Sequence, residues 1–488
     1  MADGSKIAIK FSGSGFLVIF AAPKFGLMNN LKIYKYILNI TFCILAMLFA
    51  GSCTISEWEE GFFSSESAGD NGNSGDRTHN EDRRKVLLLY SAGYNSLSNY
   101  LQEDIQDLTT GWLPKNYPNR DILLVYTHST QRKSAYEVPT TPYLIRFYEG
   151  EDGLPVADTL VTYEAGTPSA TAEQLNNVLT YVKNNFPAKS YGMVFSSHAT
   201  GYLPSGFYNN PENYEFKPKS SMMRQFGNGF SSSPVPYHEP EYDPSRPMVK
   251  SIGQDQVDTS GSYVSYEIEL VEFAKAIPMK LDYIIFDACL MGGIEVAYEL
   301  RDKCDRIGFS QTEVLAEGMN YTTMTGHLLK NTVPDPEAVC KDYFQQYIKQ
   351  SGVYQSATIS LIDCRKLEQL AQVCKSIFTN HRSGIMSISM SNVQRYYTGN
   401  YRYFYDLLSI VQEAGANAQE LKSLEDALAE CVIYGAHTPW FMEPEFRILT
   451  YSGFSMYLPR NYYTAFYFEE LNDYYKTLAW NKATGLIM

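Results

Sequence analysis

Continuous apolar runs alternate with amphipathic segments between residues 85 and 330. Such runs are typical of strands buried on both faces of a parallel sheet, and they read KVLLLYSA, RDILLVYTH, SYGMVFSSH and LDYIIFDAC. Segments with helical spacing separate them, and Thr171 is placed to cap the segment that begins TAEQL. The alternation predicts an α/β fold, a three-layer α/β/α sandwich built on a mostly parallel sheet.

The pattern changes twice along the chain. Residues 201–265 are rich in Pro, Ser, Asn and Tyr and lack periodicity, which predicts a long linker inside the 85–330 core. This linker contains basic residues that are plausible proteolytic sites, namely Lys217, Lys219, Arg224, Arg246 and Lys250. We expect residues 331–488 to form a mainly helical region that packs on the core, and to add late strands at SATISLID and YSGFSMYLP.

The N-terminal segment has the pattern of an export signal. Lysines precede an apolar run from Ile37 to Ala50, which is too short for a comfortable membrane span, and small residues follow before Cys53. This arrangement resembles a bacterial lipoprotein signal, so we expect residues 1–53 to be a leader with lipidation at Cys53. A cleaved signal or an uncleaved anchor are the alternatives, and translation from Met28 would fit the signal better.

Residues 54–84 are rich in Ser, Gly, Asn and acids, which predicts a disordered acidic tether. Acids directly after a lipidated cysteine resemble a surface-export signal, although a solvated spacer explains them equally well. We expect an exported protein that is lipid-anchored to the cell envelope, at the outer membrane and exposed on its surface. The lipid would be its only membrane contact.

Charge and cysteine spacing exclude several classes of function. The chain of 488 residues has a net charge of −14, which argues against nucleic acid as a partner because phosphate binding needs a basic surface. The sequence has no HExxH motif and no CxxC pair, so no zinc site is predicted. We expect five scattered cysteines to be buried and inert: Cys304, Cys340, Cys364, Cys374 and Cys431.

Two of the predicted strands end on residues that could perform acyl transfer. SYGMVFSSH ends at His198 and LDYIIFDAC ends at Cys289, and the carboxyl ends of parallel strands meet at one edge of a sheet. A thiol becomes a good nucleophile when a neighbouring imidazole accepts its proton. We therefore predict Cys289 as nucleophile and His198 as general acid and base. The backbone N–H groups of Ala199 and Cys289 are candidate oxyanion donors.

Asp287 lies two residues before Cys289 and should project to the same side of the strand. A carboxylate beside a nucleophile would disfavour the thiolate, so Asp287 is better suited to the floor of a pocket for a basic side chain. The alternative is that Asp287 only caps the strand end through hydrogen bonds. His128 and His327 are expected to be ordinary surface or structural residues.

At these residues the chain resembles the clostripain family of cysteine peptidases, in the caspase-like clan. The similarity lies in VLLLYSAGYNSL with EDIQDL, in YGMVFSSHATG, in DYIIFDACLMGGIEVAYEL and in GFSQTEVLAEGMNY. The resemblance implies a caspase-like sandwich, a dyad of His198 and Cys289, and cleavage after Arg or Lys with Asp287 in the specificity pocket. It also implies frequent self-processing in the linker between the two dyad residues. Some members need calcium. The chain has no EF-hand loop and its scattered acids do not establish a site, so no cofactor is predicted and calcium stays the open alternative.

The chain departs from the family pattern at two places. Ala199 follows His198 where the family usually has Gly, and TEVLAEGMNY replaces a segment that normally reads toward Pro-Gly-x-Gly-Trp. The second change leaves the preference for Arg or Lys open, with Glu313 or Glu317 as a possible second acid.

The preferred interpretation is a monomeric cysteine endopeptidase that acts on protein or peptide substrates. The alternative is a catalytically silent lipoprotein that uses the same fold for binding. Cleavage after Asn is disfavoured because Asp287 suits a neutral side chain poorly.

Overall fold

The computed structural model describes residues 84–117, 120–133, 136–208, 210–216, 230, 234–236, 246–249, 255–258, 263–399, 402–460 and 467–488. The described residues all belong to one compact unit, Asn73–Met488. The predicted leader with Cys53, residues 54–83 of the tether, and Lys217, Lys219, Arg224 and Lys250 of the linker lie outside the described residues, so these assignments stay predictions. None of the helices that the structure describes is long and apolar enough to cross a membrane.

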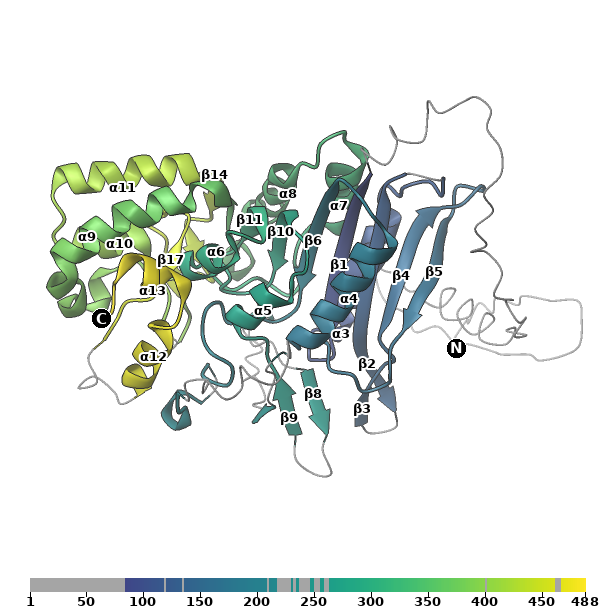
Figure 1. Ribbon diagram of the computed structural model, residues 1–488, viewed down its shortest axis with the longest axis horizontal. Coiled ribbons are helices and arrows are strands. Elements are labelled where there is room, and N and C mark those ends of the chain that lie inside the picture. The colour runs from purple at the N-terminus through teal and green to yellow at the C-terminus, as the bar shows by residue number, and fades with distance from the viewer. Residues whose placement is uncertain are drawn as a thin grey trace, which may run out of the picture. The chain divides into compact units, whose positions relative to one another are not determined.

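A large mixed sheet forms the centre of the described unit (Figure 1). Its strands are β1 (Lys85–Gly93), β2 (Ile122–Lys133), β3 (Tyr136–Pro139), β4 (Tyr143–Glu149), β5 (Pro155–Thr162), β6 (Ser190–Ser196), β10 (Leu281–Asp287), β11 (Cys304–Phe309), β12 (Thr358–Asp363) and β14 (Val432–His437). Their spatial order is β14-β12-β11-β10-β6-β1-β2-β4-β5, with β3 paired to β2. Neighbouring strands from β11 to β2 are parallel, and antiparallel strands extend the sheet on both sides.

Helices cover both faces of this sheet (Figure 1). One face carries α3 (Ser98–Thr110), α7 (Tyr321–Thr325) and α8 (Pro336–Ile348), and the other carries α4 (Ala172–Asn185), α5 (Leu270–Ala276) and α6 (Ile294–Leu300). Every residue of β1 is buried, as expected for an apolar strand between two helical layers. The predicted three-layer α/β/α sandwich on a mostly parallel sheet is confirmed.

Side-chain alternation along β10 separates two environments. Phe286 contacts the ring of Phe273 from α5, with ring centroids 5.7 Å apart. The next residue, Asp287, points to the opposite face and accepts a hydrogen bond from Tyr321 of α7 at 2.7 Å. The α5 face is therefore apolar near the strand end, whereas the α7 face holds a carboxylate.

The C-terminal region packs on the sandwich and shares its hydrophobic core, which extends from Val86 to Leu486. Its helices are α9 (Leu367–Ser387), α10 (Leu407–Glu413), α11 (Ala418–Cys431), α12 (Tyr467–Tyr475) and α13 (Ala479–Thr484). SATISLID forms β12 and joins the main sheet as predicted. YSGFSMYLP was expected to join it too, but β17 (Ser455–Met456) pairs instead with β13 (Tyr405–Asp406). The edge strand β14 was not predicted, because VIYGAH is only partly buried and follows α11 without a helix-breaking residue.

The described parts of the linker form local structure of their own. β7 (Val235–Pro236), β8 (Asp255–Asp258) and β9 (Tyr263–Tyr266) make a small antiparallel sheet, part of which lies beyond one edge of the main sheet in Figure 1. A second described segment, 246–249, pairs with the chain that follows β11. Met248 O accepts a hydrogen bond from Ala316 N at 2.8 Å, and Val249 forms an antiparallel bridge with Leu315.

The predicted cap of α4 gives a direct test of the sequence reasoning. Thr171 Oγ1 accepts a hydrogen bond from Gln174 N at 3.2 Å, which satisfies a free N–H of the first turn. Thr171→Ala should lower the free energy of unfolding by about 1 kcal/mol, whereas Thr171→Ser should retain most of it. Urea unfolding followed by circular dichroism measures both, and equal losses in the two variants would show that the methyl group matters and the cap does not.

Candidate active site

The carboxyl ends of three adjacent parallel strands converge at one edge of the sheet. Ser91 of β1 lies opposite Ser196 of β6, and Ser196 lies opposite Asp287 of β10. His198 and Cys289 each follow their paired strand residue by two positions. The register therefore delivers both predicted dyad residues to neighbouring positions at the same edge.

His198 is nearly buried, with 5% of its surface exposed. Its Nε2 lies 3.1 Å from Oγ of Ser96, a surface residue in the turn after β1, and the histidine tautomer decides which atom donates. The preceding Ser197 donates a hydrogen bond to Ala92 O at 2.9 Å, which ties this loop to β1. Ser96 was not identified from the sequence, because a single serine in a turn carries no distinguishing signal.

Cys289 lies in the turn directly after β10 and has no exposed surface. Its Sγ accepts a hydrogen bond from Val314 N at 3.0 Å and lies 3.6 Å from Val314 O. The segment after β11 thus covers the sulfur atom with its backbone. Val314 was not identified from the sequence either, because any residue type can make a contact through its backbone N–H.

The two loops touch through their backbones. Gly201, with φ +64°, approaches Leu290 so closely that a Cβ at position 201 would lie 2.5 Å from Leu290 O. Likewise, a Cβ at Gly292 would lie 2.6 Å from Gln311 N. Both glycines therefore make room for the neighbouring backbone.

Leu290 adopts φ +60°, an uncommon conformation for a residue with a side chain. Hydrogen bonds hold it there, since Leu290 N donates to Thr312 O at 3.0 Å and Gly292 N donates to Ser310 O at 2.7 Å. Backbone strain of this kind persists only where the surroundings over-determine it, and it is common at functional sites.

Asp287 is completely buried on the α7 face. Its Oδ2 accepts hydrogen bonds from Ser196 Oγ at 3.2 Å and from the Tyr321 hydroxyl at 2.7 Å. Burial and the nearby negative charge of Asp287 raise the pKa of Tyr321 well above its usual value, so Tyr321 remains a proton donor. Both alternatives for Asp287, pocket floor and strand-end cap, are compatible with this geometry.

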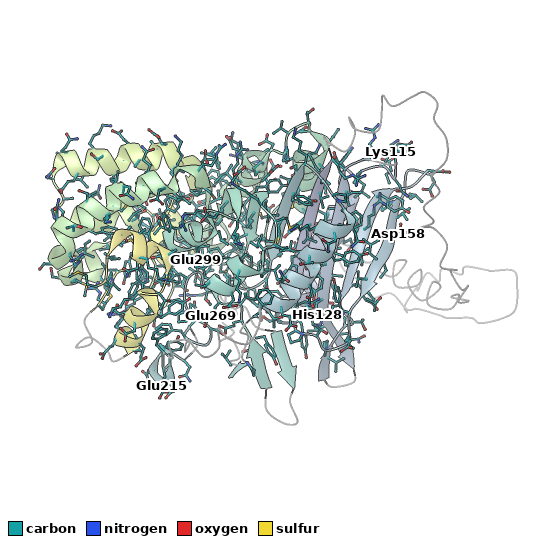
Figure 2. All side chains as sticks on the ribbon, in the orientation of Figure 1. Lys115, His128, Asp158, Glu215, Glu269 and Glu299 are labelled. Carbon is teal, nitrogen blue, oxygen red and sulfur yellow. The ribbon has the colours of Figure 1, made fainter. Side chains whose placement is uncertain are left out.

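The other singled-out residues are distributed around this edge and beyond it. Glu313, next to Val314, is buried and accepts a hydrogen bond from Thr398 at 3.1 Å, whereas Glu317 is exposed. His128, in the middle of β2 (Figure 2), is buried against Ser169, and burial lowers its pKa to about 4. His327 bonds Asp342 at 2.9 Å. Apart from Cys289, the five cysteines among the described residues are buried and form no disulfide, and the sulfur atoms of Cys304 and Cys364 lie 3.8 Å apart.

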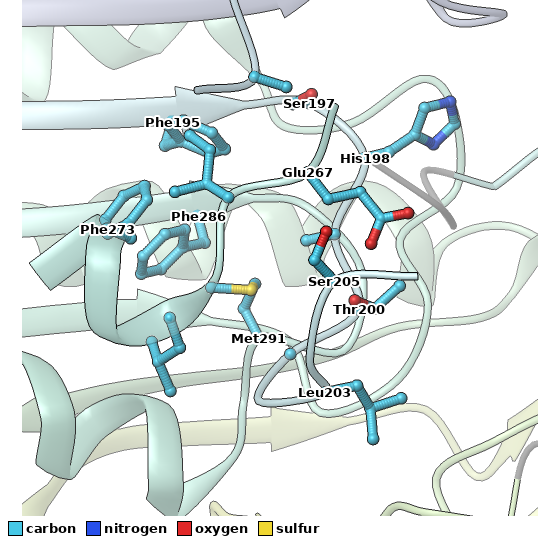
Figure 3. Close-up of a pocket in the computed structure, with 15 residues that line it drawn as sticks. Phe195, Ser197, His198, Thr200, Leu203, Ser205, Glu267, Phe273, Phe286 and Met291 are labelled. Atoms are coloured by element: carbon cyan, nitrogen blue, oxygen red, sulfur yellow. The ribbon is translucent and has the colours of Figure 1, made fainter. Parts of the chain in front are cut away.

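A cleft opens beside His198 on the α5 face of the sheet. Phe195, Phe273 and Phe286 form its apolar wall, and His198 and Glu267 lie at its polar end (Figure 3). Cys289 is not among the described residues that line this cleft. Within the described part of the chain, no group of three or more His, Cys, Asp or Glu side chains is arranged to hold a metal ion.

Comparison with known proteins agrees with the resemblance noted above. The family model described as the clostripain family matches residues 89–212 and 238–485. The chain is 23% identical over 260 residues to clostripain of Hathewaya histolytica. That match covers 50% of this chain and 41% of clostripain, so the chain spans less than half of that relative's length.

Solved structures share the fold over most of the chain. An inactive zymogen C11 protease from Parabacteroides distasonis superposes with a TM-score of 0.62 at 26% identity, covering 83% of this chain and 98% of its own. A secreted C11 cysteine protease from Bacteroides thetaiotaomicron, in complex with an irreversible peptide inhibitor, superposes with a TM-score of 0.60 at 23% identity. It covers 83% of this chain and 99% of its own.

Contact between the two loops can be tested with matched glycine variants. Gly201→Ala and Gly352→Ala both place a side chain at positive φ, +64° and +59°, which costs about 1–2 kcal/mol. Only the Gly201 variant also meets a backbone oxygen, because nothing lies within 4 Å of a Cβ at Gly352. Gly201→Ala should therefore lower the urea unfolding midpoint clearly more than Gly352→Ala. Equal midpoints would mean that the Gly201 loop can move away from Leu290 without a loss of folding stability.

Proposed function

This chain belongs to the clostripain family, and we propose that it is a cysteine endopeptidase that cleaves protein or peptide substrates with His198 and Cys289. The observation that carries the proposal is the register of β6 and β10, which brings both residues to one sheet edge. The inhibitor-bound secreted protease of the same fold supports it.

The chemistry follows from the roles of the two side chains. His198 accepts the thiol proton, the Cys289 sulfur attacks the scissile carbonyl carbon, and the negative charge moves to the carbonyl oxygen. The backbone N–H groups of Ala199 and Cys289 stabilise this oxyanion. Protonated His198 then donates its proton to the leaving amine, and the C–N bond breaks to leave a thioester. Water, deprotonated by His198, hydrolyses the thioester and restores the thiol.

Asp287 gives the enzyme a preference for Arg or Lys before the scissile bond. A buried carboxylate attracts a cationic side chain strongly, because its surroundings screen the charge poorly. The hydroxyls of Ser196 and Tyr321 hold Asp287 in position. Glu313 is the better candidate for a second acid than the exposed Glu317, because Glu313 adjoins the Val314 backbone that contacts Cys289.

We assign the described geometry to an unprocessed precursor. Linker residues 246–249 pair with Leu315 and Ala316, next to the residue that covers the Cys289 sulfur. Arg246 also forms a 2.8 Å ion pair with Glu445 of the C-terminal region. Self-processing in the linker would release this pairing, and the inactive zymogen with a similar fold supports the assignment.

The proposed location rests on the predicted leader. The mature protein is exported, carries a lipid on Cys53 and works as a monomer tethered to the cell envelope, on the outer membrane surface. Export is supported by the secreted protease of the same fold. The tether at 54–84 keeps the catalytic unit within reach of substrates near the membrane.

The alternative is a catalytically silent binding protein of the same fold. The observation that favours it is the complete burial of the Cys289 sulfur under Val314. The two proposals differ in whether Cys289 becomes reactive after the linker is cut.

Peptide cleavage by the fragment from residue 80 tests the dyad. Wild type should hydrolyse fluorogenic peptides with Arg or Lys before the scissile bond, and Cys289→Ala and His198→Ala should each lower kcat/KM at least ~10³-fold. Asp287→Asn should lower kcat/KM for the basic peptides more than for a Leu peptide, because it removes the charge that recognises the cation.

Each failure has its own meaning in this assay. Wild-type activity after another residue would keep the dyad and reject the role of Asp287. Silence of the wild type, with no labelling of Cys289 by a peptidyl chloromethyl ketone after trypsin has cut the linker, would favour the binding protein.

Self-processing predicts a defined change on a gel. Purified wild type should split into two chains whose new N-terminus lies within residues 201–265, because this linker is the substrate. Cys289→Ala should stay intact, since it lacks the nucleophile. Adding a trace of processed wild type to Cys289→Ala shows whether cleavage occurs between molecules. A wild type that remains whole yet is fully active would contradict this part of the proposal.

A further inference from the structure

Glu295 is a buried acid in the first turn of α6, directly after the loop that carries Cys289. Its side chain has no exposed surface. Its Oε1 accepts hydrogen bonds from Tyr457 N at 2.8 Å and from the Tyr475 hydroxyl at 2.7 Å. Among the described residues it forms no ion pair, and a buried carboxyl without a cation is costly to keep.

The segment held by Glu295 contacts the nucleophile loop directly. Ser455 lies two residues before Tyr457, and Ser455 N donates a hydrogen bond to Gly292 O at 2.8 Å. Ser455 also forms a parallel bridge with Gly293. Figure 1 shows β17, which begins at Ser455, beside α6. Glu295 therefore fixes the chain that supports the loop between Cys289 and α6.

The same cluster also reaches the loop that carries His198. Tyr202 is completely buried, and its ring lies 5.9 Å from that of Tyr457 and 5.8 Å from that of Tyr475. Its hydroxyl donates to Tyr403 O at 2.8 Å. Both partners of the Glu295 carboxyl thus pack against a residue that follows His198 by four positions.

We propose that Glu295 is a positioning residue, which holds Tyr457 and Tyr475 so that the C-terminal region keeps the Cys289 and His198 loops adjacent, as peptide cleavage requires. The strained φ of Leu290 requires such support from several sides. The inference rests on the proposed peptidase function, because the arrangement it preserves is the one that peptide cleavage needs.

Protonation of Glu295 gives a second measurable effect, a change of folding stability with pH. Burial raises the pKa of this carboxyl to about 7, although the Tyr457 N–H and the Tyr475 hydroxyl oppose the change. The tyrosines facing it, Tyr202, Tyr457 and Tyr475, also have raised pKa values because of burial, so they stay neutral here. Between about pH 4.5 and 7 the folded state binds the Glu295 proton more tightly than the unfolded chain does. Its contribution to stability is full below about pH 4.5 and is lost as pH rises through 7.

Two substitutions separate hydrogen bonding from charge. Glu295→Gln keeps an oxygen that can accept from Tyr457 N and Tyr475, so kcat should stay within about threefold of wild type. Glu295→Met fills similar space but accepts neither bond. Because a small displacement of catalytic groups is costly, kcat should fall about 10²-fold while KM changes less than about threefold. Relative to wild type, the melting temperature of Glu295→Gln should rise as pH increases from 5 to 7.5.

Glu299 provides a matched control on the same helix (Figure 2). It also ties α6 to the C-terminal region, since its Oε2 accepts a hydrogen bond from Ala479 N at 3.0 Å, but it lies one turn farther from the nucleophile loop. Glu299→Met should leave kcat within about twofold of wild type, even if its melting temperature falls. All rates are measured below the melting transition, with folding checked by circular dichroism.

The outcomes distinguish failure of the positioning role of Glu295 from failure of the proposed peptidase function. A wild type that neither cleaves peptides nor reacts at Cys289 would reject the peptidase itself. An active wild type with an equally active Glu295→Met variant would reject only the positioning role. Parallel losses of kcat in Glu295→Met and Glu299→Met, or failure of Glu295→Gln to retain activity, would also overturn it, because a general packing defect would then explain the effect.

Discussion

The parallel register between β6 and β10 is the constraint on which the rest of the structure depends. It places Ser196 opposite Asp287, and the two loops that follow these residues meet at one edge. A shift of one residue would move every side chain of β10 to the other face. Asp287 would then point at the phenylalanines around α5, and Phe286 would replace it beside Tyr321. The hydrophobic pattern therefore fixes the site and the core together.

The loop that carries Cys289 is held from two directions that are distant in sequence. The segment after β11 contributes Ser310, Thr312 and Val314, and the C-terminal region contributes Ser455. The C-terminal region also shares one hydrophobic core with the sandwich. The C-terminal region therefore belongs to the candidate site, because its residue Ser455 supports the loop that carries Cys289.

Sequence reasoning succeeded where burial forces a long apolar run. β1, β2, β6 and β10 were recognisable for this reason, and the topological rule for parallel sheets then brought His198 and Cys289 to one edge. It failed where pairing depends on the assembled fold. β14 is a partly polar edge strand, and the partner of β17 is β13, a strand of only two residues. The contacts of Ser96 and Val314 were invisible because one is a common turn residue and the other acts through its backbone.

The cover over Cys289 also affects the chemical lifetime of the thiol. A sulfur atom without exposed surface is hard for peroxides and small disulfides to reach, and oxidation beyond the sulfenic acid is difficult to reverse. The Val314 backbone that covers the Cys289 sulfur therefore also preserves it in the reduced form. While the sulfur stays covered the thiol is protected, and it becomes vulnerable to oxidation only once it becomes accessible.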